Sequence, residues 1–102
     1  MLKELNKYRL DDTQKQALIK ALEGVEGKIY LFGSRVDLQK KGGDVDILIF
    51  SETDEAMKLK LDIQTKYFLE ADESIDIVIM NPKKIEKEQQ AFLNSIKKVQ
   101  LK

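Results

Sequence analysis

Two short apolar runs that each carry aspartate, separated by a stretch with helical periodicity, constrain the fold of this chain more than any other feature. The runs are DVDILIF at residues 44–50 and SIDIVIM at residues 74–80, and both have the length and the β-branched content of a strand. Between them, from Thr53 to about Asp72, apolar residues recur with a helical period, which indicates one long helix. Together they predict a βαβ unit with a right-handed crossover, so the two strands are expected to be parallel and adjacent.

The flanking segments predict another strand and two more helices. Residues 11–13 are good helix-capping residues ahead of an amphipathic pattern that stops at Gly24. KIYLF at residues 28–32 predicts a strand, and NP at residues 81–82 predicts the cap and first turn of a last helix. The expected fold class is therefore α/β (α+β), with helices packed on a small mixed sheet of about three or four strands. We expect a single domain that covers residues 1–102.

The composition excludes several kinds of chemistry. The 102 residues include no cysteine and no histidine, which rules out thiolate and imidazole groups as nucleophiles, bases and metal ligands. Lys plus Arg equals Asp plus Glu at 18 each, so no net charge attracts the chain to nucleic acid or to an anionic membrane. No apolar run approaches membrane-spanning length. We therefore expect a cytoplasmic protein without general nucleic-acid binding, whose chemistry uses carboxylates, hydroxyls, amides and hard cations.

Three aspartates occupy related positions in the two aspartate-bearing runs. Side chains two residues apart in a strand share a face, so Asp44 and Asp46 are expected to project together. If the second run pairs with the first in level register, Asp76 joins them on that face. Carboxylates this close repel one another unless a cation compensates them, and Mg²⁺ prefers oxygen ligands while keeping waters or substrate phosphates. The pattern predicts a magnesium site suited to a metal–nucleotide.

A Gly33-Ser34 turn follows the strand predicted at residues 28–32. If Ser34 opens a short helical turn, its free amides and its hydroxyl are suited to phosphate oxygens, and Arg35 is placed to add a charge-assisted contact. Simpler interpretations remain open. The Gly33-Ser34 pair, taken alone, is well explained by an ordinary turn, and Arg35 by a solvated side chain or a surface ion pair.

The aspartates also have simpler interpretations. KKGGD at residues 40–44 is turn-like, so Asp44 and Asp46 would belong to a polar turn if the strand began only at Ile47. Asp76 alone would be explained as a charge that protects an edge strand from aggregation. The intact set of three favours a metal site, because a self-repelling cluster has no evident use without one.

Three separated pieces of the chain together resemble the minimal nucleotidyltransferases of the DNA-polymerase-β-like superfamily. That family has a strand ending in Gly-Ser, an Asp-x-Asp in the next strand and a third Asp in a later strand. Here these pieces are LFGS at residues 31–34, DVD at residues 44–46 and SIDIVI at residues 74–79. The order of elements agrees as well, from the first helix to the third strand. The chain departs from the family pattern at residues 36–38, just after the Gly-Ser turn.

The resemblance implies the polymerase-β-like nucleotidyltransferase fold and a role for each matched residue. It assigns Gly33 and Ser34 to the triphosphate. It assigns Asp44 and Asp46 to one or two Mg²⁺ ions, and Asp76 to the second metal and to the proton of the attacking hydroxyl. The implied reaction transfers a nucleoside monophosphate, AMP from ATP, to a hydroxyl acceptor and releases pyrophosphate.

Two classes of function remain open. Many small proteins of this family are antitoxins of toxin–antitoxin pairs that add AMP to a tyrosine of a helical HEPN-domain toxin, so the resemblance implies a HEPN partner in a hetero-oligomer. The chain is too short to carry a second domain for an acceptor. The alternative is a non-catalytic nucleotide- or HEPN-binding subunit with the same fold. Metal-dependent nucleotide binding would distinguish a functional site from a fold that only binds a partner.

Overall fold

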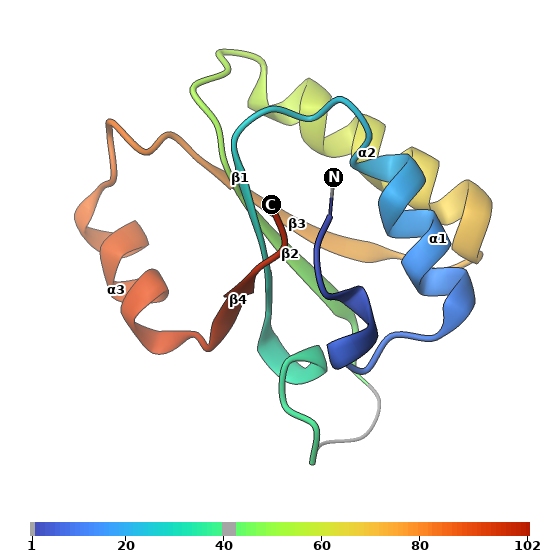
Figure 1. Cartoon of the computed structure of the whole chain (residues 1–102). Coiled ribbons are helices and arrows are strands. Elements are labelled where there is room, and N and C mark those ends of the chain that lie inside the picture. The colour runs from blue at the N-terminus through green and yellow to red at the C-terminus, as the bar shows by residue number, and fades with distance from the viewer. Residues whose placement is uncertain (1, 40–42) are drawn as a thin grey trace.

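The computed structural model describes residues 2–39 and 43–102, and it contains the small mixed sheet that the sequence predicts. The strands are β1 (Lys28–Phe32), β2 (Val45–Phe50), β3 (Ile75–Met80) and β4 (Lys98–Gln100), and the helices are α1 (Asp12–Ala21), α2 (Ala56–Ala71) and α3 (Lys87–Ser95). Two 3-10 turns are also present, η1 (Leu5–Lys7) and η2 (Gly33–Arg35). Figure 1 shows α1 and α2 on one side of the sheet and α3 on the other. Among the described helices, none has the length and apolar character needed to cross a membrane.

The predicted βαβ unit is confirmed. Strands β2 and β3 are adjacent and parallel within the sheet order β3-β2-β1-β4, and β1 is antiparallel to both of its neighbours. Strand β2 begins at Val45, so the interpretation that places Asp46 in a polar turn ahead of a strand starting at Ile47 is wrong. Asp44 lies just before the strand, and residues 40–42 of the expected turn lie outside the described residues.

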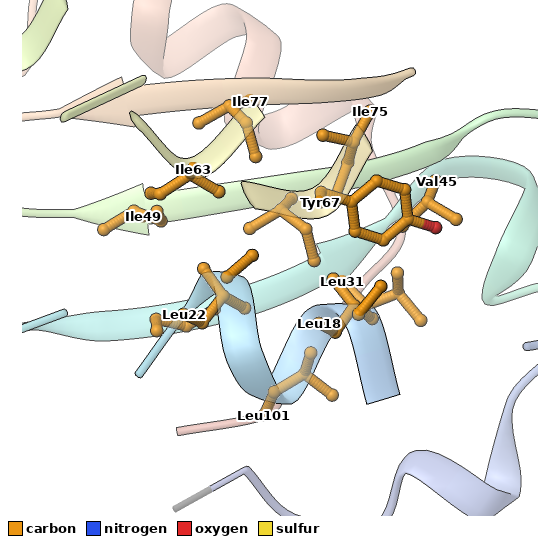
Figure 2. Packing of buried hydrophobic residues seen from close by; sticks show 14 of the residues in the cluster. Leu18, Leu22, Leu31, Val45, Ile49, Ile63, Tyr67, Ile75, Ile77 and Leu101 are labelled. Atoms are coloured by element: carbon orange, nitrogen blue, oxygen red, sulfur yellow. The ribbon is translucent and has the colours of Figure 1, made fainter. Parts of the chain in front are cut away.

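Alternation along the strands divides the apolar side chains between two faces. One face forms the main core with α1 and α2, and Figure 2 shows strand residues such as Val45 and Ile49 meeting Leu18 of α1 and Tyr67 of α2. The other face forms a smaller cluster under α3. That cluster contains Phe32, Leu48 and Met80 from the strands, with Phe92, Leu93 and Ile96 packed against them. The segment that joins β3 to β4 contains α3, and it therefore crosses the face of the sheet that also carries Asp46.

Local sequence explains where the helices begin. The Asp11 side chain caps α1 by accepting from the Gln14 N–H at 2.7 Å, as the capping residues predict. The prediction that Asn81 caps the last helix is wrong. The Asn81 side chain instead accepts from the Lys83 N–H at 2.9 Å, which makes a turn that competes with helix initiation. Helix α3 begins at Lys87 behind a capping box with Glu86.

Replacing Ile63 with alanine is expected to lower the free energy of unfolding by about 2–5 kcal/mol, because the side chain is fully buried between α2 and the sheet. Urea unfolding measures this change. The matched control is Ile19→Ala in α1, where the side chain is 45% exposed and the loss should stay below about 1 kcal/mol. Equal losses in the two variants would contradict the assignment of the core.

Candidate functional site

Asp46 and Asp76 lie side by side on the face of the sheet that α3 partly covers. They are register partners in the parallel pair formed by β2 and β3, so their side chains share a face. Phe32 is the partner of Asp46 on β1, and Lys98 is the partner of Phe32 on β4. The strands therefore pair in the level register that the prediction for Asp76 took as its condition. The two carboxylates sit at the end of the sheet where β2 and β3 begin.

The surroundings of Asp46 disfavour its charged form. Burial is the main cause, followed by hydrogen bonding with Asp76 and by the negative charges of Asp76 and Asp44, and together these raise the pKa of Asp46 to about 6. Asp46 is partly buried, whereas Asp76 is exposed. A carboxyl group with this pKa is poised to exchange its proton for a cation near neutral pH.

Asp44 differs from the other two carboxylates in lying outside the strands. It is exposed at the start of β2, and its charge contributes to the raised pKa of Asp46. Within the part of the chain that the structure describes, no three acidic side chains stand close enough together to hold a metal ion. The structure thus pairs Asp46 with Asp76 but does not bring Asp44 into a group of three with them. The donor chemistry still fits a divalent cation such as Mg²⁺, because two adjacent carboxylates on rigid strands offer oxygen ligands and an uncompensated negative charge.

Gly33 lies directly against Asp46. Its φ is +79°, and a Cβ atom at this position would come within 2.5 Å of Asp46 Oδ2. Only glycine combines this backbone conformation with so close an approach. The Gly33 N–H donates to the Lys97 carbonyl at 3.3 Å, so this amide is already bonded. Gly33 brings the turn close to the carboxylates, and the hydroxyl and N–H of Ser34 are the groups left to meet an anion at the start of η2.

A second close approach lies between Gly43 and Ser34. A Cβ atom on Gly43, whose φ is +87°, would come within 2.0 Å of Ser34 Oγ. The Ser34 hydroxyl therefore faces the backbone that immediately precedes Asp44. This contact links the predicted phosphate-binding turn to the predicted metal-binding strand.

Arg35 contacts backbone carbonyls instead of forming the solvated side chain or ion pair that remained open. Its guanidinium donates to the Gly43 carbonyl at 3.0 Å and to the Arg9 carbonyl at 2.7 Å. Arg9 in turn donates to the carbonyls of Ser34 and Asp37, both at 2.8 Å. The two arginines thus bond to the turn and to Asp37 and Gly43, and a direct contact of Arg35 with nucleotide stays a prediction. The role of Arg9 was missed because no sequence motif connects it to residues that lie more than 20 positions away in the chain.

Comparison with protein families matches a model described as polymerase beta, nucleotidyltransferase to residues 16–99. The match begins within α1, ends within β4 and contains each site residue predicted from the sequence. The chain belongs to the polymerase beta nucleotidyltransferase family. Comparisons with curated proteins and with solved structures gave no match.

Membership in the polymerase beta nucleotidyltransferase family confirms the predicted superfamily and fold class. It supports nucleotidyl transfer as the general activity. Enzymes of this family generally use a nucleoside triphosphate and a divalent metal. For a polymerase beta nucleotidyltransferase, the paired carboxylates and the adjoining Gly-Ser turn are the parts of this chain that such a reaction would require.

Proposed function

We propose that this protein transfers a nucleoside monophosphate, AMP from ATP, to a hydroxyl group of an acceptor and releases pyrophosphate. The observation that carries the proposal is the level pairing of Asp46 with Asp76 beside the close approach of Gly33. This arrangement puts two carboxylates next to a turn with hydroxyl and amide donors. Family membership supports the same class of reaction.

The three carboxylates share one role, and Asp76 has a second. Asp46 and Asp76, with Asp44, would hold one or two Mg²⁺ ions, which when bound would stabilise the charge of the transferring phosphoryl group and of the leaving pyrophosphate. Asp76 accepts the proton of the attacking hydroxyl. Its exposed side chain supports this role, because an acceptor that belongs to another molecule has to reach the base from solvent.

The turn at η2 would receive the triphosphate. The hydroxyl and the N–H of Ser34 donate to phosphate oxygens, and Arg9 and Arg35 fix the backbone from which these groups project. Because the Gly33 amide is bonded to Lys97, Gly33 contributes through its lack of a side chain. A substitution there should therefore act by steric conflict with Asp46.

Gly33→Ala is expected to weaken binding of ATP with Mg²⁺ by at least about 10-fold, because the added Cβ displaces Asp46 Oδ2. Gly24→Ala is a matched control, since Gly24 has a similar φ of +78° with nothing within 4 Å of the added atom. Both variants carry the same backbone strain of about 1–2 kcal/mol, but only the first touches the site. Calorimetric titration with ATP and Mg²⁺ compares them, and equal affinities would contradict the role given to Gly33.

We infer that the acceptor is a tyrosine of a helical HEPN-domain toxin, so that the chain is the antitoxin of a cytoplasmic toxin–antitoxin pair. The resemblance of the three motif pieces to minimal nucleotidyltransferases supports this inference. The exposed position of Asp76 supports it as well, because the hydroxyl then comes from a separate molecule. The alternative is a subunit that binds nucleotide or the HEPN protein without catalysis.

Label transfer tests the proposal directly. Purified protein is incubated with Mg²⁺, ATP labelled at the α-phosphate and a lysate of its source organism, in parallel with Asp46→Asn and with the exposed control Asp54→Asn. We expect a labelled protein band with wild type and with Asp54→Asn, and none with Asp46→Asn. If wild type labels nothing with any common nucleotide yet retains a small helical partner, the non-catalytic alternative replaces the enzyme.

A further inference from the structure

Helix α2 has apolar side chains on the side that faces away from the core. Its inner side already buries Ile63 and Tyr67. A surface helix normally has one apolar stripe and an opposite polar face. The outer apolar residues are Met57, Leu61, Phe68 and Leu69, whose side chains are 65%, 55%, 52% and 77% exposed. This second apolar side indicates that another surface covers α2.

Strand β3 is an edge of the sheet with few of the features that protect edge strands. The Ser51 N–H donates to the Met80 carbonyl at 2.9 Å, so Met80 directs its backbone groups towards β2. By alternation, the backbone groups of Ile75, Ile77 and Ile79 point outward. The Ile75 carbonyl accepts from Gln64 Nε2 of α2 at 3.1 Å, so pairing of the edge centres on Ile77 and Ile79. Protected edges usually carry lysine, proline or a bulge, whereas the sequence IDIVIM carries one aspartate as its only charge. The edge is therefore open to pairing with another strand.

The outer side of α2 and the edge of β3 form one continuous surface. A hollow of about 380 Å³ is lined by Leu61, Phe68 and Leu69 of α2 and by Ser74 and Ile75 where β3 begins. Figure 1 shows α2 lying along the part of the sheet that contains β3, at the opposite edge from β4. A partner that paired with β3 would therefore also cover the apolar residues of α2.

We propose that this surface binds a second copy of the chain, with the two β3 strands antiparallel about a two-fold axis at Ile77. In this register Ile75 of one copy faces Ile79 of the other, so the outward-pointing residues of both strands pair with one another. Asp76 faces Val78 of the second copy, so no two aspartates oppose each other. The strand is therefore complementary to itself, which is what an isologous interface requires.

The spacing of the helices also supports a second copy of the chain as the partner. Helices α1 and α2 lie on the same face of the four-stranded sheet. Each helix therefore covers about two strands, which corresponds to about 10 Å across the sheet. Pairing of the two β3 strands then sets the two α2 helices about 10 Å apart, close to the usual distance between packed helices. Met57, Leu61 and Phe68 recur at spacings of four and seven, as apolar residues do along a helix–helix seam. Gln64, which lies between Leu61 and Phe68 in this pattern, donates to the Ile75 carbonyl of the same chain. The exposed side of α2 is thus placed to pack against its copy.

This interface would also bear on the proposed active site. Asp76 lies on β3 next to Ile77, where the proposed two-fold axis passes. Its side chain is on the face of the sheet opposite α2. Val78 of the second copy would then flank Asp76 in a continuous sheet. The two sites of the dimer would lie on the same face, and each would border on the other subunit.

Sedimentation equilibrium of the purified full chain tests the proposal without nucleotide or acceptor. We expect a species of about 24 kDa, twice the chain mass of 11.8 kDa. Phe68→Glu should weaken dimerisation by at least about 30-fold, as for a residue central to an interface. Ile79→Pro should have a similar effect, because it removes an outward-facing N–H that the monomer does not need. Ile79 also packs against the main core, so this variant is compared with Ile79→Ala, which loses the same packing but keeps the N–H and should remain dimeric. The matched control Ile19→Glu, on the exposed side of α1, should remain dimeric.

Circular dichroism verifies that each variant is folded. If one of Phe68→Glu and Ile79→Pro does not fold, the other one tests the interface. A wild-type chain that is monomeric at about 100 μM would overturn the proposal, since a specific interface of standard size is stable at that concentration. A dimer that persists in both disruptive variants would also overturn it. If wild type is monomeric and Phe68→Glu instead blocks binding of a different protein, the surface belongs to that protein. Because sedimentation is measured without nucleotide or acceptor, each of these outcomes can be obtained whether or not the chain transfers nucleotide.

Discussion

Asp46→Asn is expected to stabilise the metal-free protein at neutral pH while lowering nucleotidyl transfer by about 1,000-fold or more. Both effects have one cause. Asp46 is partly buried beside Asp76, and its pKa is raised to about 6, so the ionised form that a cation needs is the form that the metal-free fold disfavours. Asparagine removes the charge, keeps the shape and can donate to Asp76.

The sign of the pH dependence follows from the raised pKa. The folded state holds the Asp46 proton up to about pH 6, whereas the unfolded chain releases it near pH 4. The stabilising contribution of the protonated group is therefore fully present below about pH 4 and is lost as the pH rises through 6. Asp46→Asn should exceed wild type in stability above pH 6, and the difference should shrink towards zero at pH 4.

The size of this gain is about 1 kcal/mol, because the full shift is reduced by solvent screening of a carboxyl group that is only partly buried. That corresponds to about 4–8 °C in the melting temperature of a domain of this size. Thermal unfolding with a chelator at pH 7.5 and at pH 4.5 measures the difference, with Asp54→Asn as the exposed control. A variant that is less stable than wild type at pH 7.5 would contradict the electrostatic assignment.

Asp76→Asn is expected to lower the rate of transfer by about 100- to 10,000-fold, the usual effect of losing a general base. Affinity for ATP with Mg²⁺ should fall by a much smaller factor than the rate, because Asp76 also helps to hold the metal while Asp46 and Ser34 still contact the nucleotide and its metal. Single-turnover kinetics with a saturating acceptor, together with calorimetric titration of ATP, separate the two quantities.

Asp72→Asn is a suitable control for this experiment. Asp72 is exposed at the end of α2 with a φ of 54°, a conformation that asparagine adopts readily. Its rate and affinity should equal those of wild type. If Asp76→Asn weakens nucleotide binding as strongly as it slows transfer, Asp76 acts in binding and the proton has another acceptor.

Local patterns were sufficient to predict the part of the fold that holds the carboxylates. Strand periodicity and the handedness of a βαβ crossover predicted parallel, adjacent strands. The register was a condition that the sequence did not fix, and the structure shows that Asp46 and Asp76 are level. The same reasoning placed Asp44 with the other two. The structure differs there because Asp44 precedes the first strand residue, Val45, and is not fixed by the alternation of the strand.

Other parts of the site depend on contacts between distant segments and carry no local signal. Strand β4 has three residues, too few for a recognisable period, so the bond from Gly33 to Lys97 could not be predicted. The arginine contacts that hold the η2 turn join segments about 25 residues apart. The start of α3 was misplaced because asparagine followed by proline suits both a helix cap and a turn, and only the Asn81 side-chain bond distinguishes them.

We propose that Asp46 and Asp76 form a metal–nucleotide site. The most direct examination of this site measures Mn²⁺ binding by electron paramagnetic resonance in the presence of a non-hydrolysable ATP analogue. We predict that wild type and Asp54→Asn bind the ion only together with the nucleotide analogue, and that Asp46→Asn does not bind it. Wild-type protein that binds no Mn²⁺ under these conditions, or Asp46→Asn protein that binds it as tightly as wild type, would contradict the assignment of Asp46 and Asp76 to this role.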